Sequence, residues 1–399
     1  MVNLIIKLNE KSFPEEFHKI GVHSASVNIF LNKNNIIPLK IFDVQSPAAN
    51  IIKQELIALG GDCAVNKHCI DCKVETSDII LLGTCRQYRK LIEKIRNMTF
   101  FKIPKIIEEL EDYFINKNKE LRTVLCDGRI INYEKMKVMG IINCTPDSFY
   151  DGSRKQTMEE TLKTAEKMLN QGADILDIGG ESTKPGSNPV SEDEEIRRVV
   201  PVIKAIKEKF KDCIISIDTY RANTAREAIK AGADIVNDIS AMKFDSNMAN
   251  IVKEYNVPII LMHTKGKPKD MQVNPTYNDL MKEVLEYFNE RLEYAKSNGI
   301  SEDKIILDPG IGFGKTLEHN LKLMNRISEL KSFNLPVLLA ASRKSTIGKV
   351  LGDIPTEERL EGTIALSCLA VEEGLQMIRV HDVQENIKAI RMLEAVRCI

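Results

Sequence analysis

One repeated unit dominates the sequence from about residue 138 to the C-terminus. A short β-branched apolar run is followed by a cluster of Gly, Asp or Asn and then by a longer amphipathic segment. The apolar runs occupy residues 138–143, 174–180, 214–219, 234–240, 258–263, 304–310, 336–342 and 377–382. Strands that alternate with helices build parallel sheets, and eight such units match a (β/α)8 (TIM) barrel. A doubly wound sheet uses the same units, but the count of eight favours the barrel.

Capping residues mark the expected ends of the helices between these strands. Thr157 and Ser191 are each followed three residues later by Glu, which is the pattern of an N-terminal capping box. Gly172, Gly232 and Gly299 stand where helices should end.

The first 120 residues lack the repeat and predict a separate, smaller α+β domain. Strand-like runs lie at 2–8, 23–30 and 78–83, and helical patterns lie at 47–61, 85–98 and 102–120. The polar run 116–122 separates this part from a predicted hairpin that turns at Asp127 and Gly128. We therefore predict an N-terminal domain of unknown role at 1–120. The barrel, with the hairpin at its N-terminal end, should occupy 121–399.

The charge balance argues against polyanionic partners. Lys and Arg number 56 and Asp and Glu 57, for a net charge of −1, and the two signs are mixed along the chain. We expect neither a nucleic-acid nor a membrane partner, because no long block of like charge appears and no apolar run approaches the roughly 18 residues that span a bilayer. The sequence is typical of a cytoplasmic protein.

The nine cysteines favour reduced thiols over a disulfide framework. Cys144 and Cys213 lie in or beside predicted strands and should be small core residues. A zinc site remains an alternative for the group Cys63, Cys69, Cys72 and Cys85, but a single CxxC pair is weak support.

Polar residues end nearly every predicted strand, where the reactive groups of this barrel lie. Asp218, Asn237, Asp308 and Lys344 come from four strands and should meet at the barrel mouth. Two carboxylates, an amide and an ammonium suit a flat heteroaromatic ring with N–H donors and carbonyl acceptors.

Strands 1 and 8 are adjacent in a closed barrel and carry a second group of polar residues, Asn143, Arg379 and His381. This quarter of the fold commonly binds phosphate, so an anionic leaving group is the expected occupant. A nucleotide P-loop is not supported, because GIGFGKT lacks the first Gly of that motif.

Six motifs in this order resemble the dihydropteroate synthase family: MGIINCTPDSFYDG, DIGGESTKPGS, NDIS, DPGIGFGKT, SRKSTIG and RVHDV. The resemblance covers residues 121–399. It implies a transferase of folate biosynthesis that joins 6-hydroxymethyl-7,8-dihydropterin diphosphate to 4-aminobenzoate. The products would be 7,8-dihydropteroate and diphosphate.

The resemblance also implies a role for each site residue. The pterin pocket would comprise Asp218, Asn237, Asp308, Lys344, Met262 and Phe313. Diphosphate and Mg²⁺ would lie at Asn143, the expected metal ligand, and at Arg379 and His381. Thr183 and Ser345 would lie by the aminobenzoate, and loops around Asp147, Phe149 and Lys184 would close over the site. Asp308, Lys344, Arg379 and His381 are the expected catalytic residues.

Two rival functions share much of this pattern. A pterin-dependent methyltransferase has the same barrel, but SRKS and RVHD would serve no purpose in it. A non-catalytic pterin-binding barrel need not keep all of these polar residues.

Lys184 stands where the family usually has Arg, so the planar contact of a guanidinium is lost there.

Two further expectations concern packing. His263 should be a packed, hydrogen-bonded residue, because His381 already serves the diphosphate.

The resemblance implies a homodimer, for which the amphipathic segment 358–374 is a candidate interface.

Overall fold

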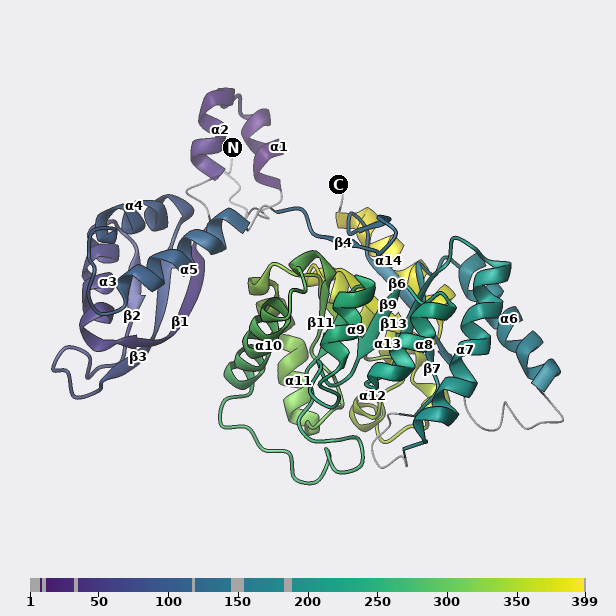
Figure 1. Cartoon of the computed structure of the whole chain (residues 1–399). Helices are drawn as coiled ribbons and strands as arrows, with labels where there is room; N and C mark the ends of the chain where they lie inside the picture. The colour runs from purple at the N-terminus through teal and green to yellow at the C-terminus, as the bar shows by residue number, and fades with distance from the viewer. Residues whose placement is uncertain are drawn as a thin grey trace. The chain divides into compact units, whose positions relative to one another are not determined.

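A computed structural model of the chain describes residues 8, 12–31, 35–116, 119–144, 154–182 and 189–397 (Figure 1). Contacts divide the chain into two compact units, Met1–Lys119 and Glu120–Ile399. Each unit has its own hydrophobic core. None of the helices that the structure describes has the length and apolar composition that a membrane crossing needs.

The second unit contains a parallel eight-stranded sheet, in the order β11-β10-β9-β8-β7-β6-β13-β12. Its strands are β6 (Lys137–Asn143), β7 (Ile175–Gly179), β8 (Ile214–Asp218), β9 (Ile235–Asp238), β10 (Ile259–Met262), β11 (Ile305–Asp308), β12 (Leu338–Leu339) and β13 (Met377–Val380). A parallel bridge between Leu307 and Val337 joins β11 to the segment that leads into β12. This bridge brings the two edges of the sheet together, so the predicted barrel is confirmed and the doubly wound alternative is wrong.

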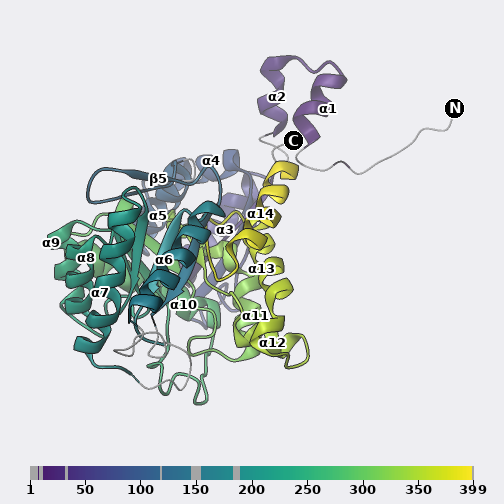
Figure 2. The same ribbon diagram turned by 90° about the vertical axis from the view of Figure 1, so that its right-hand side faces the viewer.

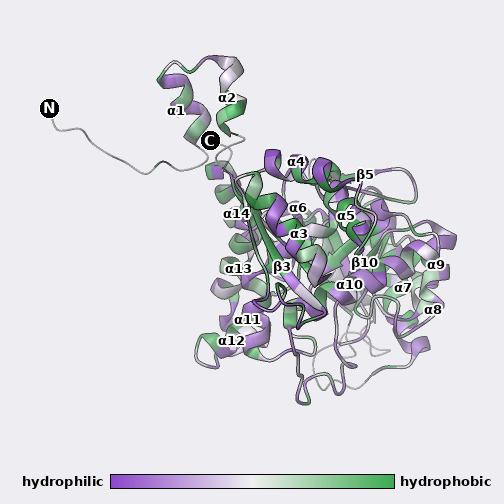
Figure 3. Ribbon diagram, turned by 90° about the vertical axis from the view of Figure 1, so that its left-hand side faces the viewer, coloured by the Kyte–Doolittle hydropathy of each residue, from purple (hydrophilic) through white to green (hydrophobic). Residues whose placement is uncertain are grey.

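Helices surround the strands on the outside (Figures 1 and 2). They are α6 (Arg154–Asn170), α7 (Glu192–Lys209), α8 (Ala222–Ala231), α9 (Met248–Tyr255), α10 (Leu280–Ser297), α11 (Leu317–Asn325), α12 (Ser345–Val350), α13 (Leu360–Glu372) and α14 (Val383–Arg397). Short 3-10 helices lie at Glu302–Lys304, Ile327–Phe333 and Thr356–Glu358. Figure 3 shows that the helices carry both hydrophobic and hydrophilic residues, as packing on one face requires.

The predicted hairpin is present as β4 (Arg122–Val124) and β5 (Ile130–Asn132). Leu125 and Ile131 of this hairpin belong to the same buried cluster as Met139, Ile175 and Met377, which lie near the starts of their strands. The hairpin therefore fills the N-terminal end of the barrel and leaves the opposite end to the site.

The observed helix ends agree with the capping residues predicted from the sequence, except at Thr157. Ser191 caps α7 by accepting a hydrogen bond from the Glu194 amide at 3.3 Å. Gly232 ends α8 in the left-handed region, with φ of 117°. The capping box predicted at Thr157 is wrong, because α6 begins at Arg154 and Thr157 lies inside it. Arg154, Lys155 and Gln156 are good helix formers, which is consistent with the earlier start.

The first unit contains a three-stranded antiparallel sheet in the order β1-β3-β2, with its own helices. Its strands are β1 (Ile37–Gln45), β2 (Asp62–Ala64) and β3 (Thr76–Gly83), and its helices are α1 (Phe13–Lys19), α2 (Ser24–Leu31), α3 (Ser46–Ala58), α4 (Cys85–Ile95) and α5 (Ile103–Asn116). The buried residues Ser77, Ile79, Leu81 and Gly83 alternate along β3.

Two sequence predictions for the first unit are corrected. Residues 23–30, predicted as a strand, form helix α2, because a short apolar run does not distinguish the two structures by periodicity. Strand β1 was not predicted. The run at 2–8 lies, apart from residue 8, outside the described residues.

The cysteines of the first unit do not form a recognisable metal site. Cys63 and Cys69 are buried, Cys72 is exposed and Cys85 is half-buried at the start of α4. No group of three or more His, Cys, Asp or Glu side chains suited to a metal occurs within the described residues. The zinc alternative therefore gains no support.

Candidate active site

The predicted ring-binding residues lie at the carboxyl ends of neighbouring strands. Asp218 ends β8 and is paired in register with Asn237 of β9. Met262 ends β10 and is paired with Asp308, the last residue of β11. Lys344 is the N-cap of α12. Barrel closure thus brings together residues that are more than a hundred positions apart in the chain.

Arg379 of β13 forms the centre of a buried ion-pair network. Its Nη2 donates to Asp218 Oδ2 at 2.6 Å, and its Nε donates to Asp177 Oδ2 at 2.5 Å. Asn237 Nδ2 donates to the same Asp177 oxygen at 3.1 Å. The structure therefore places the Arg379 side chain against the carboxylates of the predicted ring pocket, while its contact with diphosphate stays a prediction.

Asp177 is a site residue that the sequence reasoning missed. It lies in the middle of β7, every residue of which is buried. A carboxylate in a buried strand needs a partner, and this requirement is the signal that could have identified it.

Two carboxylate oxygens at this place are buried without a hydrogen-bond donor from the described residues. They are Oδ1 of Asp177 and Oδ1 of Asp218. Burial raises the pKa of Asp218, although Arg379 beside it acts in the opposite direction. Buried acceptor oxygens are normally hydrogen-bonded, so these two oxygens are suited to accept hydrogen bonds from N–H donors of a bound molecule.

Asp308 and Lys344 are oppositely charged members of the predicted ring-binding group, and their charges interact. Asp308 is 3% exposed, and its Oδ1 accepts a hydrogen bond from the Gly310 amide at 2.7 Å. Burial raises the pKa of Asp308, and the charge of Lys344 opposes the shift. Burial lowers the pKa of Lys344 to about 8, against the attraction of Asp308. Lys344 Nζ donates to the Ile311 carbonyl at 2.5 Å.

An apolar wall accompanies these polar groups. Met262 and Phe313 pack together, as predicted, in a cluster that also includes Ile239 and Met271, which were not predicted. Lys344 Nζ lies 4.7 Å from the centre of the Phe313 ring. A flat ring with polar edges suits this combination, because the apolar side chains can contact its faces and the polar groups can bond its edges.

The predicted diphosphate residues end the neighbouring strands. Asn143 ends β6 with an exposed side chain, and His381 directly follows β13. His381 Nδ1 lies 3.0 Å from Ser342 Oγ, a contact that orients the imidazole. Arg343, not predicted, makes a two-point ion pair with Asp382 at 2.7 and 2.9 Å. These contacts join the loops after β12 and β13.

Some predicted site residues lack a described position or lie apart from the buried network. Asp147, Phe149, Thr183 and Lys184 fall outside the described residues. Ser345 is the first residue of α12 and is exposed.

His263 is packed, as predicted. It is 3% exposed, and its Nδ1 lies 2.8 Å from Nζ of the buried Lys315. Burial and the neighbouring Lys315 lower the pKa of His263. Lys315 also donates to the carbonyls of Gly310 and Phe313 at 2.9 and 3.0 Å, so it holds the loop after β11.

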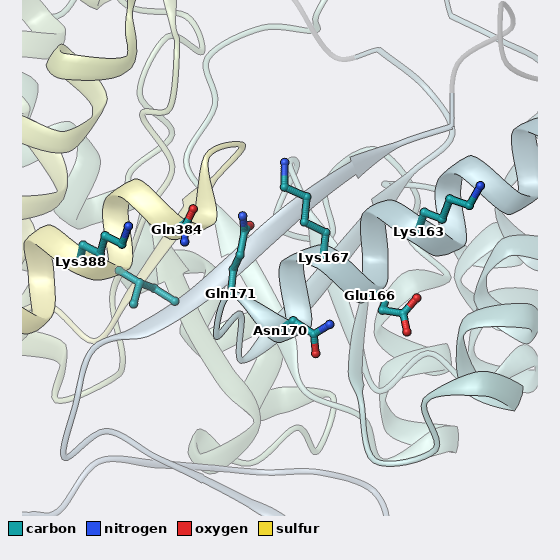
Figure 4. Close-up of a pocket in the computed structure, with 8 residues that line it drawn as sticks. Lys163, Glu166, Lys167, Asn170, Gln171, Gln384 and Lys388 are labelled. Carbon is teal, nitrogen blue, oxygen red and sulfur yellow. The ribbon is translucent and has the colours of Figure 1, made fainter.

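A groove of about 550 Å³ lies away from the strand ends, between the outer helices α6 and α14 (Figure 4). It is lined by Lys163, Lys167, Gln171, Gln384 and Lys388, among others. None of the predicted site residues lines it.

Comparison with known proteins agrees with this arrangement. The family model described as pterin binding enzyme matches residues 139–381. A dihydropteroate synthase of Clostridium beijerinckii is 47% identical over 264 residues, which cover 66% of this chain and 95% of the relative. A solved structure of Xanthomonas albilineans dihydropteroate synthase with 4-aminobenzoic acid is 37% identical with a TM-score of 0.65, and the match covers 70% of this chain and 100% of that one.

The fold and the site thus define an enzyme of the pterin-binding class built on a (β/α)8 barrel. Within that class, the chain belongs to the dihydropteroate synthase family. These relatives favour a synthase over the methyltransferase and the non-catalytic barrel.

One relative also extends into the first unit. A probable bifunctional folylpolyglutamate synthase/dihydropteroate synthase of Halobacterium salinarum is 37% identical over 354 residues, which cover 89% of this chain and 42% of that protein. The second unit, Glu120–Ile399, is shorter than this match. Part of the first unit is therefore shared with a longer protein.

Proposed function

We propose that the barrel joins 6-hydroxymethyl-7,8-dihydropterin diphosphate to 4-aminobenzoate, as a transferase of folate biosynthesis. The observation that carries this proposal is the buried group of Asp177, Asp218, Asn237 and Asp308, in which Oδ1 of Asp177 and Oδ1 of Asp218 have no hydrogen-bond donor from the described residues. The apolar cluster of Met262 and Phe313 lies at the ends of the same strands and the loop that follows them. Membership in the dihydropteroate synthase family supports it.

The carboxylates and Asn237 would form hydrogen bonds with the edge of the pterin ring. A carboxylate can accept two N–H bonds, so Asp218 suits the amino group and the adjacent ring nitrogen. Lys344 supplies a donor for a ring carbonyl. Met262 and Phe313 would contact the faces of the ring.

The reaction forms a C–N bond and breaks a C–O bond. The lone pair of the aniline nitrogen attacks the methylene carbon, the diphosphate leaves with the electrons of the C–O bond, and the nitrogen then loses a proton. Positive charge develops on the pterin side in the transition state. Asp308 would stabilise that charge, and His381 and Arg379 would stabilise the departing anion.

Mg²⁺ is the proposed metal, and Asn143 would hold it together with the diphosphate oxygens. The donor set fits, because Mg²⁺ prefers oxygen ligands and commonly keeps only one or two from the protein in phosphate sites. When bound, the ion would neutralise charge on the leaving group. Asn143 is suited to this role because its side chain is exposed at the end of β6, next to β13.

We also propose a homodimer that uses the segment 358–374. Val350 and Leu351, just before this segment, are 53% and 49% exposed. Analytical ultracentrifugation at several protein concentrations tests the oligomeric state. A monomer at every concentration would contradict the proposed homodimer.

A direct assay tests the reaction. Purified protein is mixed with the dihydropterin diphosphate, 4-aminobenzoate and Mg²⁺, and both diphosphate and dihydropteroate are measured. We expect equimolar formation of the two products. Folded protein that forms neither would contradict the proposal.

A further inference from the structure

A lysine side chain is buried inside the loop that connects β11 to α11. Lys315 is 2% exposed and directly precedes Thr316, the N-cap of α11. Its Nζ donates to the carbonyls of Gly310 and Phe313 at 2.9 and 3.0 Å, and it lies 2.8 Å from His263 Nδ1. Its hydrogen-bond partners among the described residues are carbonyls and an imidazole, and none is a carboxylate. Lys315 therefore joins its own loop to the residue that follows β10.

Two glycines let this loop lie directly against the loop after β10. Gly310 and Gly314 have φ of 67° and 62°, in the left-handed region that favours glycine. A Cβ atom on Gly310 would overlap the His263 carbonyl oxygen, and one on Gly314 would overlap the Lys265 carbonyl oxygen. This close approach brings the Lys315 amine within reach of His263.

Three members of the predicted pterin pocket belong to this loop or contact it. The Gly310 amide donates to Asp308 Oδ1 at 2.7 Å. The Ile311 carbonyl accepts a hydrogen bond from Lys344 Nζ at 2.5 Å, and Phe313 lies in the apolar cluster. Each of these groups lies next to or between the two carbonyls that the buried amine holds.

Other side chains hold further peptide groups of the loop. Tyr277 Oη donates to the Gly314 carbonyl at 2.8 Å, and Asn320 Oδ1 accepts a hydrogen bond from the Gly312 amide at 2.7 Å. Neither contact involves a carbonyl that Lys315 holds. Removal of the lysine amine should therefore displace the part of the loop that meets the pocket, while the rest of the loop keeps its anchors.

We propose that Lys315 is a positioning residue that fixes the β11–α11 loop and so places Asp308 and Phe313 for the pterin ring. The inference rests on the proposed function for the identity of that ligand. A loop that is held in place before binding has less conformational freedom to lose, so loss of the amine should weaken pterin binding. The diphosphate residues Asn143 and His381 lie at the ends of other strands and should keep their geometry.

Methionine in place of lysine tests the role of the amine. Lys315→Met keeps a long unbranched side chain and removes every N–H donor. We expect the Kd for the dihydropterin diphosphate to rise about 10-fold, with the Kd for inorganic diphosphate in the presence of Mg²⁺ changed less than about 2-fold. Titration calorimetry on the folded protein measures both values. A role in stability alone would not produce this difference between the two ligands.

Lys304→Met is the matched control. Lys304 is 6% exposed, and its Nζ donates to the carbonyls of Val124 and Asn256 at 2.7 and 3.0 Å. It is also a buried amine bonded to carbonyls, but it directly precedes β11, at the opposite end of the barrel. This variant should lose stability and leave the Kd values for both ligands unchanged.

Lys315→Gln covers the case in which Lys315→Met does not fold, because the amide keeps N–H donors on a shorter side chain. It should weaken binding of the dihydropterin diphosphate by a smaller factor. An unchanged Kd for this ligand in a folded variant overturns the proposal, as does an equal loss of affinity for inorganic diphosphate.

Calorimetry needs no turnover, so the positioning role and the proposed reaction can fail separately. An active wild-type protein whose Lys315 variants bind the pterin substrate normally contradicts the positioning role alone. A wild-type protein that binds this substrate but forms no product contradicts the proposed reaction alone.

Discussion

Arg379 Nη2 donates a hydrogen bond to Asp218 Oδ2 at 2.6 Å across a separation of 161 positions in the chain. The same guanidinium binds Asp177, so one cation is shared by two buried carboxylates. The excess of negative charge in this pair of contacts favours a ligand that presents N–H donors.

Asp177→Asn should destabilise the barrel by about 2–3 kcal/mol, because a fully buried ion pair loses one partner while Arg379 keeps the other. The affinity for the dihydropterin diphosphate should fall as well. Denaturant unfolding and titration calorimetry measure the two effects. Asp174→Asn in the same segment is the control, since Asp174 pairs with Lys137 at a partly exposed site and should cost less. Equal losses in the two variants would contradict a special role for Asp177.

Asp308→Asn should lower kcat about 100-fold, because the amide cannot stabilise positive charge that develops on the pterin. The fold should persist, since the side chain keeps its shape and an acceptor for the Gly310 amide. Circular dichroism checks the fold and single-turnover kinetics check the chemistry. Near-normal turnover would rule out the proposed role of Asp308.

The affinity for the pterin substrate should weaken as the pH rises through about 8, the pKa to which burial lowers Lys344. Below that pH the side chain carries a positive charge and donates strongly to a ring carbonyl, and above it the charge is lost. Calorimetric Kd values between about pH 6.5 and 9.5 measure this change. In Lys344→Arg the charge persists throughout the range, so the profile should flatten. Identical profiles for the two proteins would assign the titration to another group.

Asn143→Ala should raise the Mg²⁺ concentration for half-maximal activity about 10-fold, because the metal would lose its protein oxygen ligand. Chelation of Mg²⁺ with EDTA should abolish turnover of the wild-type protein, and added Mg²⁺ should restore it. Activity that persists in EDTA would contradict a metal requirement. An unchanged Mg²⁺ dependence in the variant would contradict only the assignment of Asn143.

The strand-end residues illustrate how far local sequence patterns reach. Asp218, Asn237, Asp308 and Lys344 could be grouped in advance, because parallel strands of a barrel end at one rim. Met262 and Phe313 were predicted as site residues only from the family resemblance, and in the structure they pack in one cluster. Helix α2 was predicted as a strand, since its short apolar run lacks a distinguishing period.

The sequence alone determined the eight βα units, their order and the polar residues that follow each strand, because these depend on patterns within a few residues of one another. The tertiary structure decided which of those residues meet. The contacts of Arg379 with Asp177 and Asp218 join three different strands, β13, β7 and β8. Such contacts exist only after the barrel has closed and buried these charges, when each side chain must find a partner of opposite charge or a hydrogen-bonding group within reach.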